Sequence, residues 1–110
     1  MGGLVATQTF ARLFMFPSVY HCGGGFGPNQ FDLINPIVHW VEQDTAPARI
    51  VATQTDAGGA TVRTRPVFPY PEQARYTGTG SIDDATNFVG VMPAHLPNDN
   101  FDWVGQDLFH

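Results

Sequence analysis

The chain has 110 residues, of which 43% are apolar and only 14% charged, and its formal net charge is −5. This length suits a single domain over 1–110 with a modest core, and the low charge predicts that more protein covers part of its surface. All five basic residues are arginines that do not cluster, so nucleic acid and membrane are not expected partners. No apolar run approaches the ~18 residues of a membrane span. A single cysteine excludes an internal disulfide.

The first third of the chain reads as a helix, a strand and a glycine-rich loop. Residues 4–11 have the composition of a mild helix former. Residues 13–16 form a continuous apolar run, typical of a strand buried on both faces of a parallel sheet. The loop at 17–28 contains four glycines and carries His21 beside Cys22. A sheet can deliver a histidine from a strand end onto a rigid loop in this way.

A helical period begins after this loop. Asn29 is predicted to cap the helix, and Asp32 suits its positive end. Pro36 should kink the first turns, and the helix should end at 45–47, where Thr-Ala-Pro interrupts the pattern. The apolar positions at helical spacing are Phe31, Ile34, Val38 and Val41, widened by Leu33, Ile37 and Trp40.

Two β-rich runs follow the helix. Residues 49–54 and 61–67 are predicted to pair as a hairpin through the turn at 56–60. The string Val-Ala-Thr-Gln-Thr stands at 51–55 and also at 5–9. Because the flanking residues do not match, we interpret this as coincidence and not as an internal repeat.

The last part of the chain is expected to be irregular from Pro66 onward, since prolines and glycines recur there. A short helical turn is predicted within 81–87, because Ser81 with Asp84 resembles a capping box. The tail at 97–110 is acidic and aromatic, and it can be ordered only if its aromatic side chains dock against the rest of the protein.

His21 is the strongest candidate for chemistry, because a histidine on a rigid loop can act as a general base. The alternative is a loop histidine whose nitrogens bond backbone carbonyls. Cys22 could be a nucleophile, but adjacent side chains point in different directions, so a structural thiol or half of a disulfide is the better interpretation. Ser18 could approach His21 across the turn, although a nucleophile would also need an oxyanion hole opposite it.

Other familiar sites are not indicated. The glycine run lacks the spacing of a phosphate-binding loop. The histidines and the cysteine show no paired spacing for zinc, and the acidic tail lacks the calcium-loop pattern, so no metal or cofactor is expected. Ser18 and Ser81 are the only serines, and neither lies in a Gly-x-Ser-x-Gly nucleophile motif.

The chain contains a series of short motifs in a particular order. His-Cys-Gly-Gly-Gly stands at 21–25 and is preceded by Phe-Ala-Arg-Leu-Phe-Met at 10–15. Further motifs are Trp-Val-Glu at 40–42, Ala-Pro-Ala-Arg-Ile-Val-Ala at 46–52, Arg-Thr-Arg-Pro at 63–66, Pro-Tyr-Pro at 69–71, Ala-Arg-Tyr-Thr-Gly at 74–78 and Asp-Asp-Ala-Thr-Asn-Phe at 83–88. In this combination the sequence resembles the C-terminal part of the tannase/feruloyl esterase family, the α/β-hydrolase-fold serine esterases.

The resemblance implies an α/β fold that forms the C-terminal segment of an α/β-hydrolase: a strand, the histidine loop, a helix, a β-hairpin and an irregular wrapping tail. It assigns His21 as the triad base, which takes a proton from a serine and returns it to the leaving alcohol. It assigns Cys22 to a disulfide with a cysteine just before that serine. In the family the serine, its cysteine, the triad acid and the substrate-selecting lid lie upstream of the matching region, so a truncated form is expected here.

Two departures from the family pattern stand out. Family members often carry two further cysteines that pair, and Phe68 and Gly90 stand at or near those places, as expected where that bond is absent. Ser18 stands where a glycine is usual in the turn before the histidine. This substitution alters the turn but leaves the base in place.

These observations predict a carboxylic ester hydrolase of the tannase/feruloyl esterase type, present as a truncated form, with small phenolic, aryl or alkyl esters as substrates. Two alternatives stay open: a minimal or oligomeric esterase that uses His21 with Ser18 or a group from a second chain, and a non-catalytic interaction module. Whether the chain is an enzyme alone, and in which compartment, also stays open, although such proteins are often secreted or periplasmic. An exposed sheet edge predicts a homo-oligomer, with Cys22 available to bridge two chains.

Overall fold

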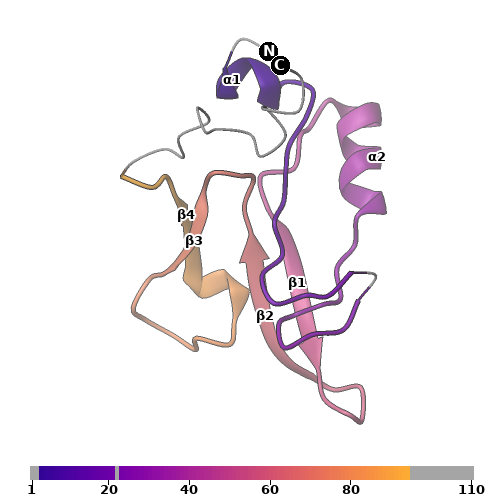
Figure 1. The fold of residues 1–110 in the computed structure, drawn as a ribbon, viewed down its shortest axis with the longest axis vertical. Coiled ribbons are helices and arrows are strands. Elements are labelled where there is room, and N and C mark those ends of the chain that lie inside the picture. The colour runs from indigo at the N-terminus through magenta and orange to yellow at the C-terminus, as the bar shows by residue number, and fades with distance from the viewer. Residues whose placement is uncertain (1–2, 22, 95–110) are drawn as a thin grey trace, which may run out of the picture.

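The computed structural model describes residues 3–21 and 23–94, so Cys22 and the tail at 97–110 lie outside the described residues. Figure 1 shows a hairpin with a helix on one side and a second strand pair on the other. The elements in chain order are α1 (Leu4–Gln8), α2 (Ile34–Gln43), β1 (Ile50–Thr55), β2 (Thr61–Val67), β3 (Gln73–Tyr76), the 3-10 turn η1 (Ala85–Asn87) and β4 (Phe88–Val91).

The hairpin of β1 and β2 confirms the two predicted β-runs. The strands pair antiparallel, from Ile50 opposite Val67 to Thr55 opposite Thr61, with one irregularity near the turn. In the turn the Asp56 carboxylate accepts two backbone N–H groups at 2.9 Å each. An aspartate that bonds nearby backbone in this way holds the chain reversal.

The buried apolar core lies on one face of this hairpin and is small. Ile50 and Ala52 alternate on β1 and are 6% and 1% exposed, and Val67, opposite Ile50, is 8% exposed. Ala85, which follows on η1, is 3% exposed. Because successive strand residues point to opposite faces, these side chains form one patch, and the hairpin is the best-buried part of the described chain.

The second strand pair, β3 with β4, differs from the irregular chain predicted after Pro66. It runs antiparallel from Gln73 opposite Val91 to Tyr76 opposite Phe88. The sequence Gln-Ala-Arg-Tyr of β3 has no β-branched residue, and β4 contains a glycine. β3 therefore depends on pairing across the chain, whereas Phe88, Val89 and Val91 give β4 a strand propensity of its own.

The helical turn predicted within 81–87 is present as η1, with a different cap. The Asp84 carboxylate accepts the Thr86 backbone N–H at 2.9 Å and its hydroxyl at 2.8 Å. These hydrogen bonds to Thr86, the backbone one first, lower the pKa of Asp84. The Ser81 hydroxyl instead accepts the Asp83 N–H at 3.1 Å, so Ser81 shapes the preceding turn and Asp84 is the cap.

The helix predicted from Asn29 begins later, at Ile34, and Asp32 takes the role that the sequence assigned to Asn29. The Asp32 carboxylate accepts the backbone N–H groups of Ile34 and Asn35 at 2.9 and 3.2 Å. A carboxylate at this end satisfies N–H groups that have no partner within the helix. Pro36 is the third helical residue, where its missing N–H costs the helix no intrahelical bond.

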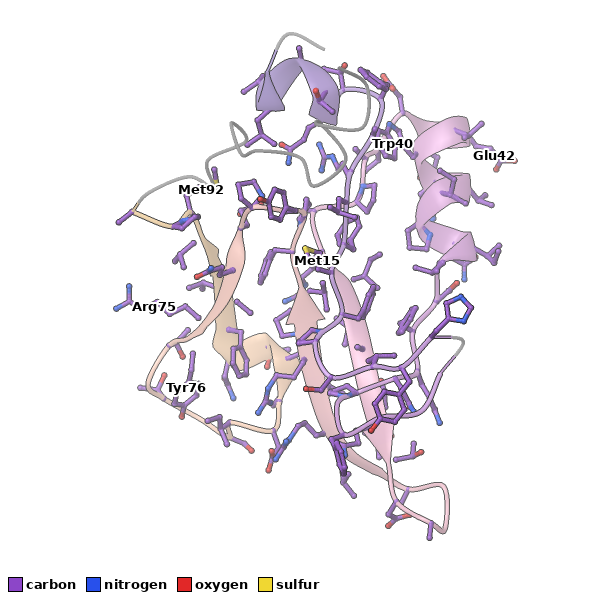
Figure 2. The ribbon with its side chains drawn as sticks, viewed as in Figure 1. Met15, Trp40, Glu42, Arg75, Tyr76 and Met92 are labelled. Carbon is purple, nitrogen blue, oxygen red and sulfur yellow. The ribbon has the colours of Figure 1, made fainter. Side chains whose placement is uncertain are left out.

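The other end of α2 confirms the predicted stop before 45–47. Asp44 adopts a left-handed conformation with φ 54°, and the Thr45 N–H closes the last turn by donating to the His39 carbonyl at 3.4 Å. Near this end Trp40 extends toward the Arg12 segment, whereas Glu42 points away from it (Figure 2). The Arg12 guanidinium carbon lies 5.6 Å from the Trp40 ring centroid, so a cation–π contact ties α2 to the N-terminal segment.

The strand predicted at 13–16 is wrong. Only Phe14 forms a bridge, with Pro69, and one further backbone hydrogen bond of 2.7 Å reaches the Leu13 carbonyl. Leu13 and Met15 are 57% and 61% exposed. The described residues provide no parallel neighbour for this segment, and a strand without a paired neighbour is not stable.

Phe68 and Gly90, which stand at or near the places where the resemblance implies a pair of cysteines, lie against each other. A Cβ atom added at Gly90 would lie 2.8 Å from Cδ1 of Phe68, closer than real Cβ contacts allow. The Phe68 ring therefore occupies the space that any side chain at Gly90 would need. The large Phe68 side chain packed over Gly90 can thus fill a volume similar to that of two cysteine side chains.

Candidate active-site loop around His21

The loop that carries His21 folds back on itself. Val19 and Gly25 form an antiparallel bridge, and the Tyr20 N–H donates to the Gly24 carbonyl at 3.1 Å. His21 lies at the turn of this narrow hairpin and its side chain is exposed. A side chain at such a tip can reach a substrate or a partner group while its backbone stays fixed.

Ser18 sets the base of the loop through its backbone. Its φ is +58°, a left-handed value that suits glycine, the usual residue of the family at this place. The Ser18 carbonyl accepts the Gly27 N–H at 3.0 Å. A Cβ atom at Gly25 would lie only 2.3 Å from the same carbonyl oxygen. Glycine is thus required at 25 because the two arms of the loop approach so closely.

The C-terminal arm of the loop is anchored to β1. Gln30 and Thr53 exchange backbone hydrogen bonds of 3.1 and 2.7 Å, and the Gln30 side chain donates to the Thr55 hydroxyl at 3.1 Å. Phe16 and Phe31, from the two ends of the loop segment, stack with centroids 3.9 Å apart. The hairpin therefore serves as the rigid platform on which the His21 loop is held (Figure 1).

The structure describes two of the three candidate residues that the sequence indicates. His21 and Ser18 lie on the same tight loop, three residues apart, and both are exposed. Ser18 contributes to the loop through its carbonyl and its backbone conformation. Cys22 lies outside the described residues. In the part of the chain that the structure describes, no three His, Cys, Asp or Glu side chains converge as a metal site would require.

A hollow that was not predicted from the sequence lies beside this loop. Ser18, Phe26 and Gly27 border it on the loop side, and Arg63 and Arg65 border it on the β2 side. The signal was present in Arg-Thr-Arg, since residues two apart on a strand point to the same face. Desolvation first, and then the neighbouring Arg63, lower the pKa of Arg65, while Asp83 acts in the opposite direction.

Across the described residues, no helix has the length and apolar character needed to cross a membrane.

The sequence of this chain is similar to that of known proteins. The family described as "Tannase and feruloyl esterase" matches residues 1–91. The chain is 46% identical over 86 residues to mono(2-hydroxyethyl) terephthalate hydrolase of Piscinibacter sakaiensis, which covers 76% of this chain and 14% of that protein. It is 41% identical over 91 residues to an Arthroderma benhamiae protein named "Probable feruloyl esterase", covering 80% of this chain and 17% of that one. The chain thus spans less than a fifth of the length of these relatives.

Solved structures agree with this match. Feruloyl esterase B from Aspergillus oryzae superposes with a TM-score of 0.69 at 24% identity, covering 77% of this chain and 20% of that one. A second esterase from Aspergillus oryzae gives 0.68 at 26% identity, covering 79% and 20%. The predicted fold class, a segment of an α/β-hydrolase, is confirmed. With a family match that extends over most of its length, the chain belongs to the tannase and feruloyl esterase family.

Proposed function

We propose that this chain supplies the general base of a carboxylic ester hydrolase, and that His21 is that base. The observation that carries the proposal is the position of His21 at the tip of a tight loop, held by the Val19–Gly25 bridge, within a segment of an esterase family. The backbone of such a loop is fixed before substrate arrives. Fixing a catalytic group in advance lowers the entropic cost of reaching the transition state.

In this mechanism the His21 imidazole removes a proton from a nucleophilic hydroxyl as it attacks the ester carbonyl. The same nitrogen then returns the proton to the leaving alcohol, and a water molecule repeats the cycle on the acyl intermediate. The nucleophile comes from another segment of the protein, because neither Ser18 nor Ser81 lies in a Gly-x-Ser-x-Gly nucleophile motif. Cys22 would tie the loop to that segment through a disulfide.

The proposed substrates are small phenolic, aryl or alkyl esters. The names of the two relatives refer to esters of terephthalic and ferulic acid, both of which are aromatic carboxylic acids. This supports an ester with an aromatic acyl group as the first substrate to try.

The direct test is a chimera in which residues 1–91 replace the matching segment of the 46% identical relative. We expect the chimera to hydrolyse an aryl ester and His21→Ala to reduce kcat/KM by roughly 10⁴-fold or more. His39→Ala, an exposed histidine on α2, is the matched control and should leave activity unchanged. A folded chimera without activity, or with activity that survives His21→Ala, would contradict the proposal.

The isolated chain, assayed beside Ser18→Ala, decides between the open alternatives. Activity lost in both His21→Ala and Ser18→Ala would favour a minimal esterase with a local serine. Activity lost only with His21→Ala would place the nucleophile elsewhere, for example on a second chain. A chain that is inactive alone but active in the chimera is the expected result.

Self-association is part of the same proposal. Leu13 and Met15 expose an apolar strip along a segment with a largely unpaired backbone, and such surfaces associate. We expect a homodimer or larger assembly in size exclusion with light scattering, shifted toward monomer by Leu13→Glu. Val5→Glu, at an 83% exposed position on α1, is the control. A strict monomer at about 10 µM would contradict self-association, since specific interfaces commonly bind in this range or more tightly.

A further inference from the structure

The hollow beside the His21 loop lies on the face of the hairpin that also carries the core. Its floor is formed by Ala52 of β1 together with Arg63 and Arg65 of β2. Arg65 lies opposite Ala52 in the register, so these side chains share one face of the sheet. Ser18 and Gly27 close the hollow on the loop side. The same rigid elements therefore position both the His21 loop and this hollow.

Positive charge exceeds negative charge at the floor. Arg63 Nε pairs with the Asp83 carboxylate at 2.8 Å, with both side chains nearly half exposed. Arg65 has no carboxylate partner of its own among the described ion pairs, and it donates to backbone carbonyls instead. Two guanidinium groups thus share one carboxylate at the rim of a partly desolvated hollow. An anion would balance the remaining charge.

Aromatic rings form the walls. Phe16 is held in a stack against Phe31, and Phe26 meets the edge of Tyr20 with centroids 6.5 Å apart. The Arg65 guanidinium carbon of the floor lies 4.7 Å from the centroid of the Phe88 ring. Phe16, Phe26 and Phe88 all border the hollow, and aromatic faces and edges of this kind favour a planar ring between them.

A buried polar atom on the same face is also without a partner. Among the described residues, Gln54 Oε1 is buried and accepts no hydrogen bond. Gln54 lies directly opposite Arg63 in the hairpin register and is not itself among the residues that line the hollow. Buried acceptors normally find a donor, so an unmatched one marks a place where a ligand or water completes the structure.

We propose that this hollow binds an aromatic carboxylate, with the ring between the phenylalanine walls and the carboxylate on Arg63 and Arg65. The choice of ligand rests on the proposed function, because ester hydrolysis releases a carboxylic acid. The hollow is separate from the His21 side chain, which is not among its lining residues. It therefore acts as a subsite for the acid product, or for a second carboxylate on the substrate, and not as the place of bond cleavage.

Arg65 also has a structural role, which decides the choice of variant. Its guanidinium donates to the Ile82 carbonyl and to the Thr64 carbonyl and so fixes the segment before η1. Removing it would disturb the fold as well as the charge. Arg63 is held by one exposed ion pair, so Arg63→Gln removes charge with little structural cost.

The test is a titration of the full chain with benzoate, followed by amide chemical shifts. We expect shifts at Ala52, Arg63 and Phe88, and a Kd increased roughly five- to tenfold in Arg63→Gln, as for loss of one charge-assisted contact. Arg75→Gln, an exposed arginine on β3, is the matched control and should bind benzoate as the parent does. Neutral benzamide should bind at least about fivefold more weakly than benzoate for the same reason.

Equal binding of benzoate and benzamide, or an unchanged Kd in Arg63→Gln, would overturn the proposal, as would the absence of saturable shifts up to about 20 mM benzoate. The His21→Ala variant separates this proposal from the proposed function. It should lose turnover in the chimera while binding benzoate normally in the isolated chain. Benzoate binding lost together with His21 would assign the ligand to the catalytic loop instead.

Discussion

The same five residues, Val-Ala-Thr-Gln-Thr, form helix in one place and strand in another. At 5–9 they belong to α1 and its C-cap, and at 51–55 they belong to β1. In the helix Thr7 and Thr9 bond backbone carbonyls of their own turn through their hydroxyls, at 2.8 and 2.6 Å. In the strand the corresponding backbone pairs with β2. The same residues, with the same local propensity, thus form a helix or a strand according to the hydrogen-bond partners that surround them.

The two copies of Val-Ala-Thr-Gln-Thr also differ in how deeply their side chains are buried. Val5 is 83% exposed and Val51 39%, while Ala6 is exposed and Ala52 is 1% exposed. Only the strand copy contributes to the core. The helix, predicted over 4–11, ends at Gln8 and has no buried residue, so a short helix without a packed face stops early.

Ala52 and Ala6 give the strongest test of this difference. Ala52→Glu would place a carboxylate in the core on one face of the hairpin and should cost about 3 kcal/mol or more of unfolding free energy. Ala6→Glu, at the same place in the other copy, should change stability by less than about 0.5 kcal/mol. Urea unfolding followed by far-UV circular dichroism measures both. Similar losses at both alanines would mean that α1 is packed in solution.

A second matched pair lies in the His21 loop, where Gly25 and Gly23 both have positive φ. Gly25→Ala would force a Cβ atom to 2.3 Å from the Ser18 carbonyl oxygen, whereas at Gly23 nothing lies within 4 Å. We expect Gly25→Ala to cost about 2–3 kcal/mol and to disperse the loop resonances, and Gly23→Ala to cost about 1 kcal/mol from backbone strain alone. Thermal unfolding with amide spectra of each variant distinguishes them. Equal losses would show that the close approach of the two arms is not fixed in solution.

The contact between Phe68 and Gly90 gives a smaller effect. Gly90→Ala places a methyl group against the Phe68 ring and should cost about 1–2 kcal/mol. Phe68→Leu should then recover part of that loss, which a double-mutant cycle in urea would quantify. Gly58→Ala, whose Cβ would make only an ordinary 3.4 Å contact, is the control. Additive effects of the two core changes would refute direct packing.

Replacing Asp32 should change the stability least, and this change in stability should depend on pH. Hydrogen bonds from Asn35, its backbone N–H first, and from Ile34 lower the pKa of Asp32 below 3.8. A carboxyl with a lowered folded pKa stabilises the fold above its unfolded pKa and loses that contribution as pH falls through the folded value. Asp32→Asn should therefore lower the thermal midpoint at pH 7 more than at pH 2.5. Glu42→Gln on α2 controls for charge, and equal shifts at both pH values would contradict the helix-end role.

Sequence alone predicted the elements whose partners are close along the chain. The hairpin of β1 and β2 needs only a turn and two β-rich runs, so its strands and turn were predictable from 49 to 67. The position of α2 followed from its apolar period, but its start did not. Asn29 and Asp32 are both good caps, and which of them caps depends on how the chain leaves the Gln30–Thr53 bridge.

The predictions from sequence are wrong where the structure of a segment depends on contacts with residues far away along the chain. Residues 13–16 have a strand's composition, yet only Phe14 forms a bridge, with Pro69, and the side chains of Leu13 and Met15 are exposed to solvent. β3 has little strand propensity and forms because β4 lies beside it. For the site, the motif placed His21 on a loop and Arg-Thr-Arg placed Arg63 and Arg65 on one strand face, but only the structure shows that this face and the loop border the same hollow.

The reciprocal hydrogen bonds between Gln30 and Thr53 have a kinetic consequence. Both amides exchange with solvent only when this pair opens, and Thr53 is an interior residue of β1. Opening the C-terminal arm of the loop therefore requires local unfolding of the strand, so the two amides should show the same exchange free energy. Tyr20, on the far arm, has its own bond to Gly24 and can exchange faster. The C-terminal arm of the loop thus opens only together with the hairpin, whereas the arm that presents His21 is held separately by the Val19–Gly25 bridge.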